Sequence, residues 1–240
     1  NGCMDAQHIW WLVPDILAAG YSLLRVNMRG AGPARPLAKG TYNACAGADL
    51  LAFITAAADH DPNVPLFMMA HSLGGTAALN MALDFPRETA RLAGLVTIGT
   101  PLDMMATSRR FSRHRNRVYG RHMLLALKHI AGTAPGISNE TLAAAFSARS
   151  VREFDDRVTA PMAGHRNAAA YYRASSVHER MQKIARPVLV LHGSNDPWVP
   201  SKTCLKLPVP NDPLAGVSVV VTRGGGHVGF HDSQLNWHIR

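Results

Sequence analysis

Short apolar runs alternate with longer stretches of helical spacing along most of the chain. Five runs rich in Val, Leu and Met have the length of buried strands and are bounded by Gly, Pro or Asn. These runs are residues 23–28, 64–70, 95–99, 188–192 and 217–222. Helical spacing covers residues 48–58 and 75–83, and Pro86 stops the second of these helices. The alternation predicts an α/β fold with a mostly parallel sheet flanked by helices.

The stretch from residue 104 to residue 180 breaks this alternation. It is basic at first and then helical, and it contains no convincing strand. The sequence therefore predicts a core in two parts, residues 1–103 and 181–240, with a helical cap inserted between them at residues 104–180.

The formal net charge of +9 is concentrated in one segment. Between Met104 and Asn139 there are six arginines and one lysine but no acidic residue. These cations are Arg109, Arg110, Arg113, Arg115, Arg117, Arg121 and Lys128. The simplest interpretation is a solvated face, and the alternative is attraction to an anionic lipid surface or substrate. Specific nucleic-acid recognition is disfavoured, because no aromatic stacking pattern or zinc-ligand spacing accompanies the charge.

Composition limits the class of protein and its possible cellular location. The chain has 240 residues, 47% of them hydrophobic, which suits one sizeable domain with an insertion. No apolar run approaches the 18 or so residues of a membrane span. The three cysteines are odd in number and far apart, and the start shows no signal-peptide pattern. We expect a cytoplasmic location, with peripheral contact to a membrane as the alternative.

Ser72 lies in the stretch M-M-A-H-S-L-G-G-T-A-A-L, residues 68–79. The tripeptide S-x-G is common, so by itself it also fits an ordinary serine at a turn. Its setting is more specific, because an apolar strand ends at Ala70 and small residues open a helix directly after the serine. This is the strand, turn and helix arrangement of a nucleophile elbow, although Ala70 stands where an elbow normally has glycine.

A nucleophilic serine needs a base to accept its proton and an acid to orient that base. Asp196 follows the run at 188–192, and His227 lies in a glycine-rich loop after the run at 217–222. Both therefore follow late strands, in the order serine, acid, histidine. The alternatives are that Asp196 caps a turn before Pro197 and that His227 only packs.

Seven segments together resemble the YheT-like branch of the α/β-hydrolase superfamily. They are N-M-R-G-A-G-P (27–33), A-H-S-L-G-G (70–75), N-R-V-Y (116–119), E-F-D-D-R-V-T-A-P (153–161), Y-Y-R-A-S-S (171–176), N-D-P-W-V-P (195–200) and G-G-G-H-V-G-F-H (224–231). The resemblance implies an α/β-hydrolase fold and hydrolysis of small-molecule carboxylic esters, either acyl or lipid-like. It implies neither a metal nor an organic cofactor.

The resemblance also implies a role for each site residue. Ser72 would attack the ester, His227 would move the proton, and Asp196 would orient the imidazole. The oxyanion would be held by the backbone N–H groups of Leu73 and Cys3. Two competing hypotheses remain: a catalytically impaired hydrolase-fold binding protein, and a binder of anionic surfaces through residues 109–128.

Several neighbouring residues admit other roles. Asp155 and Asp156 could be proposed as the acid, but structural ion pairs with Arg152 and Arg157 are the preferred interpretation. His71 is expected to line the pocket, as a substrate-binding or packing residue.

Two further patterns are not interpreted as ligand sites. His227 and His231 have the spacing of two zinc ligands on a helix, but the preceding glycines and the lack of an intervening acid argue against zinc. The G-A-G at residues 30–32 lacks the spacing of a phosphate-binding loop and indicates a turn after a strand.

In the superfamily, three strands precede the segment that corresponds to residues 1–3. The third of them lies in the sheet between the strands that correspond to residues 23–28 and 64–70. The sequence is therefore expected to be N-terminally incomplete, or to form a sheet in which these two flanking strands pair directly.

Overall fold

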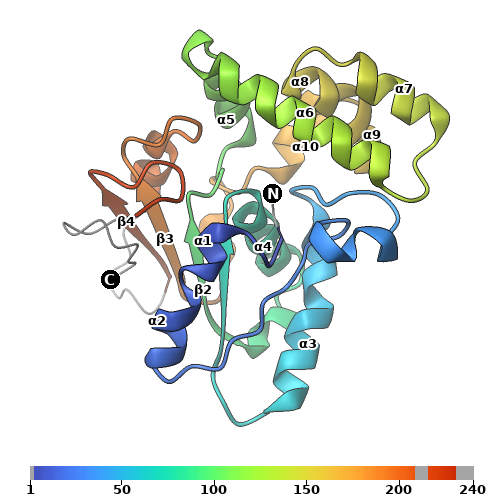
Figure 1. Cartoon of the computed structure of the whole chain (residues 1–240). Coiled ribbons are helices and arrows are strands. Elements are labelled where there is room, and N and C mark those ends of the chain that lie inside the picture. The colour runs from blue at the N-terminus through green and yellow to red at the C-terminus, as the bar shows by residue number, and fades with distance from the viewer. Residues whose placement is uncertain (1–2, 209–215, 231–240) are drawn as a thin grey trace.

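A four-stranded parallel sheet forms the centre of the computed structural model, which describes residues 3–208 and 216–230. Its strands are β1 (Leu66–His71), β2 (Leu92–Ile98), β3 (Val188–Gly193) and β4 (Val217–Thr222). They lie in chain order and every neighbouring pair is parallel (Figure 1). The predicted parallel α/β architecture is confirmed.

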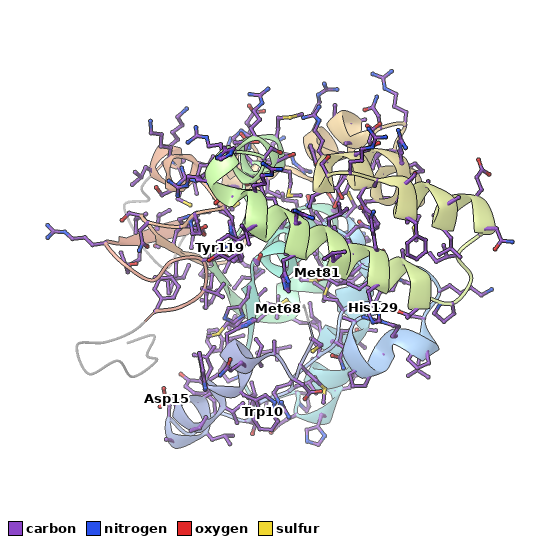
Figure 2. The ribbon with its side chains drawn as sticks, turned by 45° about the horizontal axis from the view of Figure 1, so that its top comes forward. Trp10, Asp15, Met68, Met81, Tyr119 and His129 are labelled. Carbon is purple, nitrogen blue, oxygen red and sulfur yellow. The ribbon has the colours of Figure 1, made fainter. Side chains whose placement is uncertain are left out.

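Helices α3 (Leu51–His60) and α4 (Leu73–Asp84) correspond to the two predicted helical stretches. Every residue of α4 from Gly75 to Ala82 is buried, because this helix packs between the sheet and the surrounding loops. Met81 of α4 is fully buried, and Met68 of β1 packs against the same core cluster (Figure 2). A buried and mostly apolar helix directly after β1 fixes the turn between them.

The segment at residues 23–28 is not a strand, so this prediction is wrong. An extended run forms a strand only beside another strand, and none lies next to it in the described chain. It lies instead against the N-terminal segment, where it contacts Met4 and Trp10, the last residue of α1 (Gln7–Trp10). Helix α2 (Val13–Ala18) precedes it in the chain. The Arg25 guanidinium lies 4.0 Å from the centre of the Trp10 ring, and Asn27 Oδ1 accepts from the Met4 N–H at 2.9 Å.

Because residues 23–28 form no strand, they do not pair directly with β1. Among the described residues β1 is an edge strand, and Phe67 and Met69 of this strand are exposed. Gly30 and Gly32 form the predicted turn, both with positive φ, but residues 3–29 before it contain no strand.

Residues between β2 and β3 form helices and contain no strand. The α-helices are α5 (Met104–Phe111), α6 (Arg117–Thr133), α7 (Asn139–Ser147), α8 (Val151–Phe154), α9 (Ala160–Met162) and α10 (Ala168–Ser175), with a π-helix, η5, at Asp155–Thr159. Figure 1 shows α6, α7 and α8 above one end of the sheet. Phe154 and Val158 pack with Leu124 in a small core of their own. The boundaries of the cap at 104 and 180 stay a prediction.

Short 3-10 helices complete the described chain. They are η1 (Gly32–Leu37), η2 (Ala46–Leu50), η3 (Glu88–Arg91), η4 (His114–Asn116), η6 (Met181–Lys183) and η7 (Ser201–Lys206). Over residues 3–208 and 216–230, no helix combines the length and the hydropathy needed to cross a bilayer.

The two glycines that open α4 provide a matched test of its packing. A Cβ at Gly75 would overlap the buried Thr100 side chain, whereas a Cβ at Gly74 meets nothing within 4 Å. We expect Gly75→Ala to lower the free energy of unfolding by about 1–3 kcal/mol through overpacking. Gly74→Ala should leave it unchanged or raise it by up to about 1 kcal/mol. Urea unfolding of both variants measures these free energies, and equal changes in the two variants would contradict the close packing of Gly75 against Thr100.

Candidate active site

Ser72 stands at the sharp turn between β1 and α4. Its φ of 51° and ψ of −129° make it the one non-glycine residue with positive φ in the described part of the chain. The turn is held from both sides: the Ser72 N–H donates to Ile98 O at 2.8 Å, and the Gly75 N–H donates to Ser72 O at 2.9 Å. A residue forced into this backbone region is strained, which is the feature expected of a nucleophile elbow.

Ala70 does not disturb this turn. It lies within β1, pairs in register with Thr97 of β2, and packs at the margin of the main core. Its methyl group is accommodated in the sheet, so glycine is not needed at this position.

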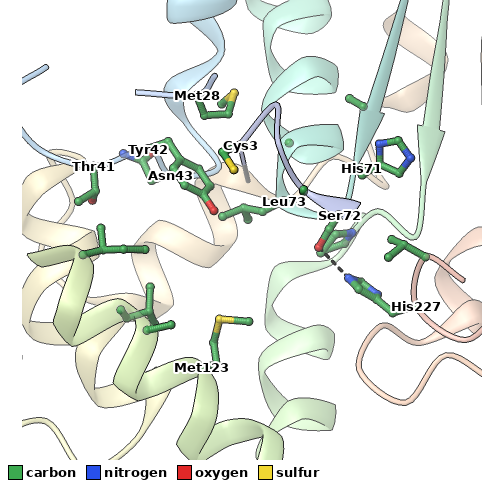
Figure 3. Close-up of a pocket in the computed structure, with 18 of the residues that line it drawn as sticks. Cys3, Met28, Thr41, Tyr42, Asn43, His71, Ser72, Leu73, Met123 and His227 are labelled. Atoms are coloured by element: carbon green, nitrogen blue, oxygen red, sulfur yellow. Dashed lines mark hydrogen bonds between the residues drawn. The ribbon is translucent and has the colours of Figure 1, made fainter. Parts of the chain in front are cut away.

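Asp196 and His227 converge on Ser72 from the loops after β3 and β4. His227 Nδ1 lies 2.8 Å from Asp196 Oδ2, and His227 Nε2 lies 2.8 Å from Ser72 Oγ (Figure 3). Since an ionised carboxylate only accepts hydrogen bonds, Nδ1 carries the proton and Nε2 accepts from the serine hydroxyl. The structure therefore brings together the three side chains that the sequence singled out.

The Asp196 carboxylate is fully buried, but its hydrogen-bonding capacity is used. Oδ1 accepts from the backbone N–H groups of Trp198, at 2.8 Å, and Val199, at 2.9 Å, while Oδ2 accepts from His227. Hydrogen bonds from several donors offset the cost of burying a carboxyl group. Asp196 therefore caps its own turn through Oδ1, as the alternative expected, but it also contacts His227 through Oδ2.

Gly99 permits the close approach of the His227 loop. It follows β2 with φ of 59°, and a Cβ there would overlap the backbone carbonyl oxygen of His227. A glycine in this position lets the backbone of the loop lie against the end of the sheet.

A cavity of about 730 Å³ opens beside Ser72 and His227. Most of its wall is apolar and comes from the N-terminal segment, β1, α5, α6 and the π-helix. Figure 3 shows Met123 of α6 reaching toward the cavity from the side opposite Cys3 and Leu73. Such a cavity suits an apolar ligand whose reacting group lies at the mouth near the serine.

Leu73 and Cys3, the predicted oxyanion donors, both line this cavity. The N–H groups of the first turn of a helix have no carbonyl partner within the helix, and Leu73 is the first residue of α4. Asn1 and Gly2, which precede Cys3, lie outside the described residues. The oxyanion role of both N–H groups stays a prediction.

Comparison with known proteins agrees with this geometry. A family model described as alpha/beta hydrolase fold matches residues 1–234. The chain belongs to the α/β-hydrolase fold family.

Relatives of this α/β-hydrolase include a putative esterase, YheT, from Escherichia coli K12. It is 32% identical over 176 residues, which cover 70% of this chain and 49% of the relative. Phospholipase ABHD3 of Mus musculus is 28% identical over 217 residues, covering 88% of this chain and 51% of the relative. The chain thus spans about half the length of these relatives. The first match confirms the YheT-like resemblance.

Solved structures show the same fold. The esterase Pf2001 of Pyrococcus furiosus superimposes with a TM-score of 0.59 at 17% identity, covering 95% of this chain and 70% of that structure. A monoacylglycerol lipase of Paleococcus ferrophilus gives a TM-score of 0.54 at 17% identity, covering 94% of this chain and 82% of that structure. The described strands thus follow the sheet of this hydrolase fold.

His71 lies in the cavity wall beside Ser72. Burial, helped by the nearby His8 and His227 imidazoles, lowers the pKa of His71 to about 3. Its ring centre lies 5.0 Å from that of His8, and its buried Nε2 has no hydrogen-bond partner among the described residues. His71 is therefore neutral at ordinary pH, and its substrate-binding role stays a prediction.

The predicted ion pairs of Asp155 and Asp156 are wrong. Asp155 Oδ2 accepts from the Tyr172 hydroxyl at 2.6 Å, and Asp156 Oδ1 accepts from a backbone N–H. Arg157 pairs instead with Glu153, at 2.8 Å. The cause is the π-helix at Asp155–Thr159, because its wider turn directs Asp155 into the wall of the cavity, away from the exposed arginines.

His192 is a buried neighbour of the site that the sequence did not single out. Its Nε2 lies 3.2 Å from Val199 O and 3.8 Å from Asp196 Oδ2, and burial lowers its pKa. The available signal was a histidine ending an apolar run four residues before Asp196. A neutral His192 supports the Asp196 loop without adding a charge.

Metal ligation finds no support in the part of the chain that is described. There, no three His, Cys, Asp or Glu side chains are grouped so that they could hold a metal ion. His231, the partner in the spacing considered for zinc, lies outside the described residues.

The carboxyl group of Asp155 predicts a pH-dependent stability. Burial raises its pKa from 3.8 to about 6, so from pH 4 to pH 6 the folded protein holds a proton that the unfolded chain has released. Wild-type stability therefore contains a contribution that is lost as the pH rises through 6. We expect Asp155→Asn to be more stable than wild type by about 2–3 kcal/mol above pH 6 and to lose this gain near pH 4. Urea unfolding at both pH values tests this, and an equal gain at both would contradict it.

Proposed function

We propose that this α/β-hydrolase is a serine esterase that cleaves carboxylic esters through an acyl-enzyme. The observation that carries the proposal is the hydrogen-bonded series Ser72, His227 and Asp196 at the mouth of an apolar cavity. The strained backbone of Ser72 adds to it, because such strain gathers at functional sites. The names of relatives, which include esterases and lipases, favour the same chemistry.

The proposed reaction has two halves. Ser72 Oγ attacks the ester carbonyl carbon while its proton passes to His227 Nε2, and Asp196 stabilises the resulting imidazolium. The tetrahedral intermediate collapses to an acyl-serine, and His227 gives the proton to the departing alcohol. Water then attacks the acyl-serine with the same histidine as base, releasing the carboxylic acid and restoring the serine hydroxyl.

Two backbone N–H groups would stabilise the negative oxygen of each tetrahedral intermediate. The Leu73 N–H lies at the positive end of α4, where the helix dipole adds to its effect. Cys3 lines the same cavity and is the proposed second donor. Every step uses groups of the chain itself and water, so we propose no metal or organic cofactor.

The cavity favours an acyl or lipid-like ester. Its apolar walls match a hydrocarbon chain, and its volume of about 730 Å³ falls in the range of pockets that enclose ligands of drug size. The relatives named as a phospholipase and a monoacylglycerol lipase agree with an acyl substrate.

The nucleophile is tested by replacing the serine. We expect Ser72→Ala to lower kcat for a p-nitrophenyl acyl ester by about 10⁴-fold or more and to abolish labelling by a fluorophosphonate probe. Ser108→Ala removes a hydroxyl elsewhere in the cavity wall and should still be labelled. Labelling that persists in Ser72→Ala would contradict the proposed triad. A wild-type chain that binds the ester but never reacts would instead support the impaired binding protein.

A second candidate function, binding to an anionic lipid surface, is favoured by one surface feature. Arg109, Arg110, Arg113 and Lys202 line a hollow of about 490 Å³ between α5 and the start of η7. Among the described residues that line it there is no acidic side chain, and Arg109, Arg113 and Lys202 are exposed. Cations gathered in this way attract anionic headgroups without selecting a particular one.

Vesicle sedimentation tests this candidate. We expect retention on phosphatidylglycerol vesicles that weakens with salt and falls on the order of 100-fold when Arg109, Arg113 and Lys202 become Gln. Arg110 is kept, because its guanidinium holds the Asp196 loop. The matched control neutralises three exposed cations elsewhere, Arg87, Lys183 and Arg223. Equal losses in both variants would show a general charge effect and contradict a localised surface.

A further inference from the structure

The loop that carries Asp196 is held from outside by the segment between α5 and α6. Asn116 Nδ2 donates to Pro197 O at 2.8 Å and to Arg110 O at 2.9 Å. Arg110 reaches the same loop, with Nη2 donating to Asp196 O at 2.8 Å and Nε donating to Pro197 O at 3.3 Å. Two consecutive carbonyl groups of the acid loop are therefore bound by side chains from the inserted helices.

Asn116 suits this position because its side-chain amide carries two N–H donors. Asn116 is only 2% exposed, and its side-chain amide donates both hydrogen bonds to backbone carbonyl oxygens. A leucine or an aspartate of similar size offers no such donors, and it would leave the Pro197 carbonyl without this partner.

A second contact from the same segment reaches the histidine through Trp198. The Tyr119 ring lies 5.3 Å from the Trp198 ring, and Trp198 lies 4.6 Å from the His227 imidazole. Phe111, at the end of α5, approaches Trp198 at 5.9 Å. Tyr119 occupies the first turn of α6, on the side of that helix nearest the loops that follow β3 and β4 (Figure 2).

These supporting residues are separate from the cavity that would receive the ester. Arg110, Asn116 and Tyr119 do not line it, whereas Phe111, Trp198 and His227 do. A change at Asn116 or Tyr119 would therefore alter the geometry between His227, Asp196 and Ser72 without removing a contact to substrate. Errors of about 1 Å in such an arrangement cost on the order of 100-fold in rate.

We propose that the N-R-V-Y segment, residues 116–119, is a positioning element for the Asp196 loop. Asn116, together with Arg110, fixes the loop backbone. Tyr119 supports Trp198 against His227. Neither Asn116 nor Tyr119 is a catalytic residue in this assignment. The proposal rests on the esterase function for its effect on rate, but its structural part does not depend on turnover.

Hydrogen exchange of the full chain tests the structural part. The N–H groups of Trp198 and Val199 donate to Asp196 Oδ1, so their exchange reports the geometry of the loop. In Asn116→Ala we expect exchange in a peptide covering residues 194–200 to rise about tenfold, because two hydrogen bonds are lost, while α4 is unchanged. Asn167→Ala is the matched control, since the Asn167 side chain caps α10 by accepting from the Ala170 N–H.

Kinetics with a p-nitrophenyl acyl ester test the functional part. Asn116→Ala should lower kcat by about 10- to 100-fold and leave KM within about twofold. Tyr119→Ala should lower kcat several-fold, whereas Tyr119→Phe, which keeps the ring, should match wild type. Tyr119 is 52% exposed, so the two Tyr119 variants test the proposal even where Asn116→Ala fails to fold.

The outcomes separate the two hypotheses. Unchanged loop exchange in both Asn116→Ala and Tyr119→Ala, or acceleration equal to that in α4 or in Asn167→Ala, would overturn the positioning role while leaving the esterase untouched. A wild-type chain without esterase activity would remove the proposed function, and faster loop exchange in Asn116→Ala would still establish the positioning element.

Discussion

The backbone of Ser72 is the constraint on which the geometry of the site depends. A serine with positive φ is strained by about 1–3 kcal/mol, and it persists only because its surroundings leave no alternative. The hydrogen bond to Ile98 O ties the turn to β2, and the buried helix α4 prevents it from relaxing outward. The same strain presents Oγ above the end of the sheet, where His227 accepts its hydrogen bond.

The parallel sheet explains why the other two side chains meet it. All four strands end at one edge, so the loops after β1, β3 and β4 gather there although their residues are up to 155 positions apart. Glycine at residue 99 removes the side chain that would separate the His227 loop from this edge. The buried Asp196 carboxylate is then stabilised by donors from its own loop, and that loop is bound in turn by Arg110 and Asn116.

The residue pattern agrees with the structure where its signal is local or ordered along the chain. Strands β1, β3 and β4 coincide with short apolar runs between breakers. The meeting of Ser72, Asp196 and His227 agrees with their order after strands, and their catalytic role stays a proposal. The residue pattern failed at residues 23–28, where an apolar run has no neighbouring strand in the described chain. It also failed at Asp155, because the π-helix that turns this carboxyl into the cavity has no signature in the residue pattern.

The sequence by itself determined the α/β class, the strand, turn and helix setting of Ser72 and the order of the proposed triad, because hydrophobic periodicity and turn residues act over a few positions. Only the tertiary structure decided the 2.8 Å contacts of His227, the shape of the apolar cavity and the support of the Asp196 loop by Asn116. These depend on which surfaces pack together, and a buried polar side chain acquires its partner and its pKa only from that packing.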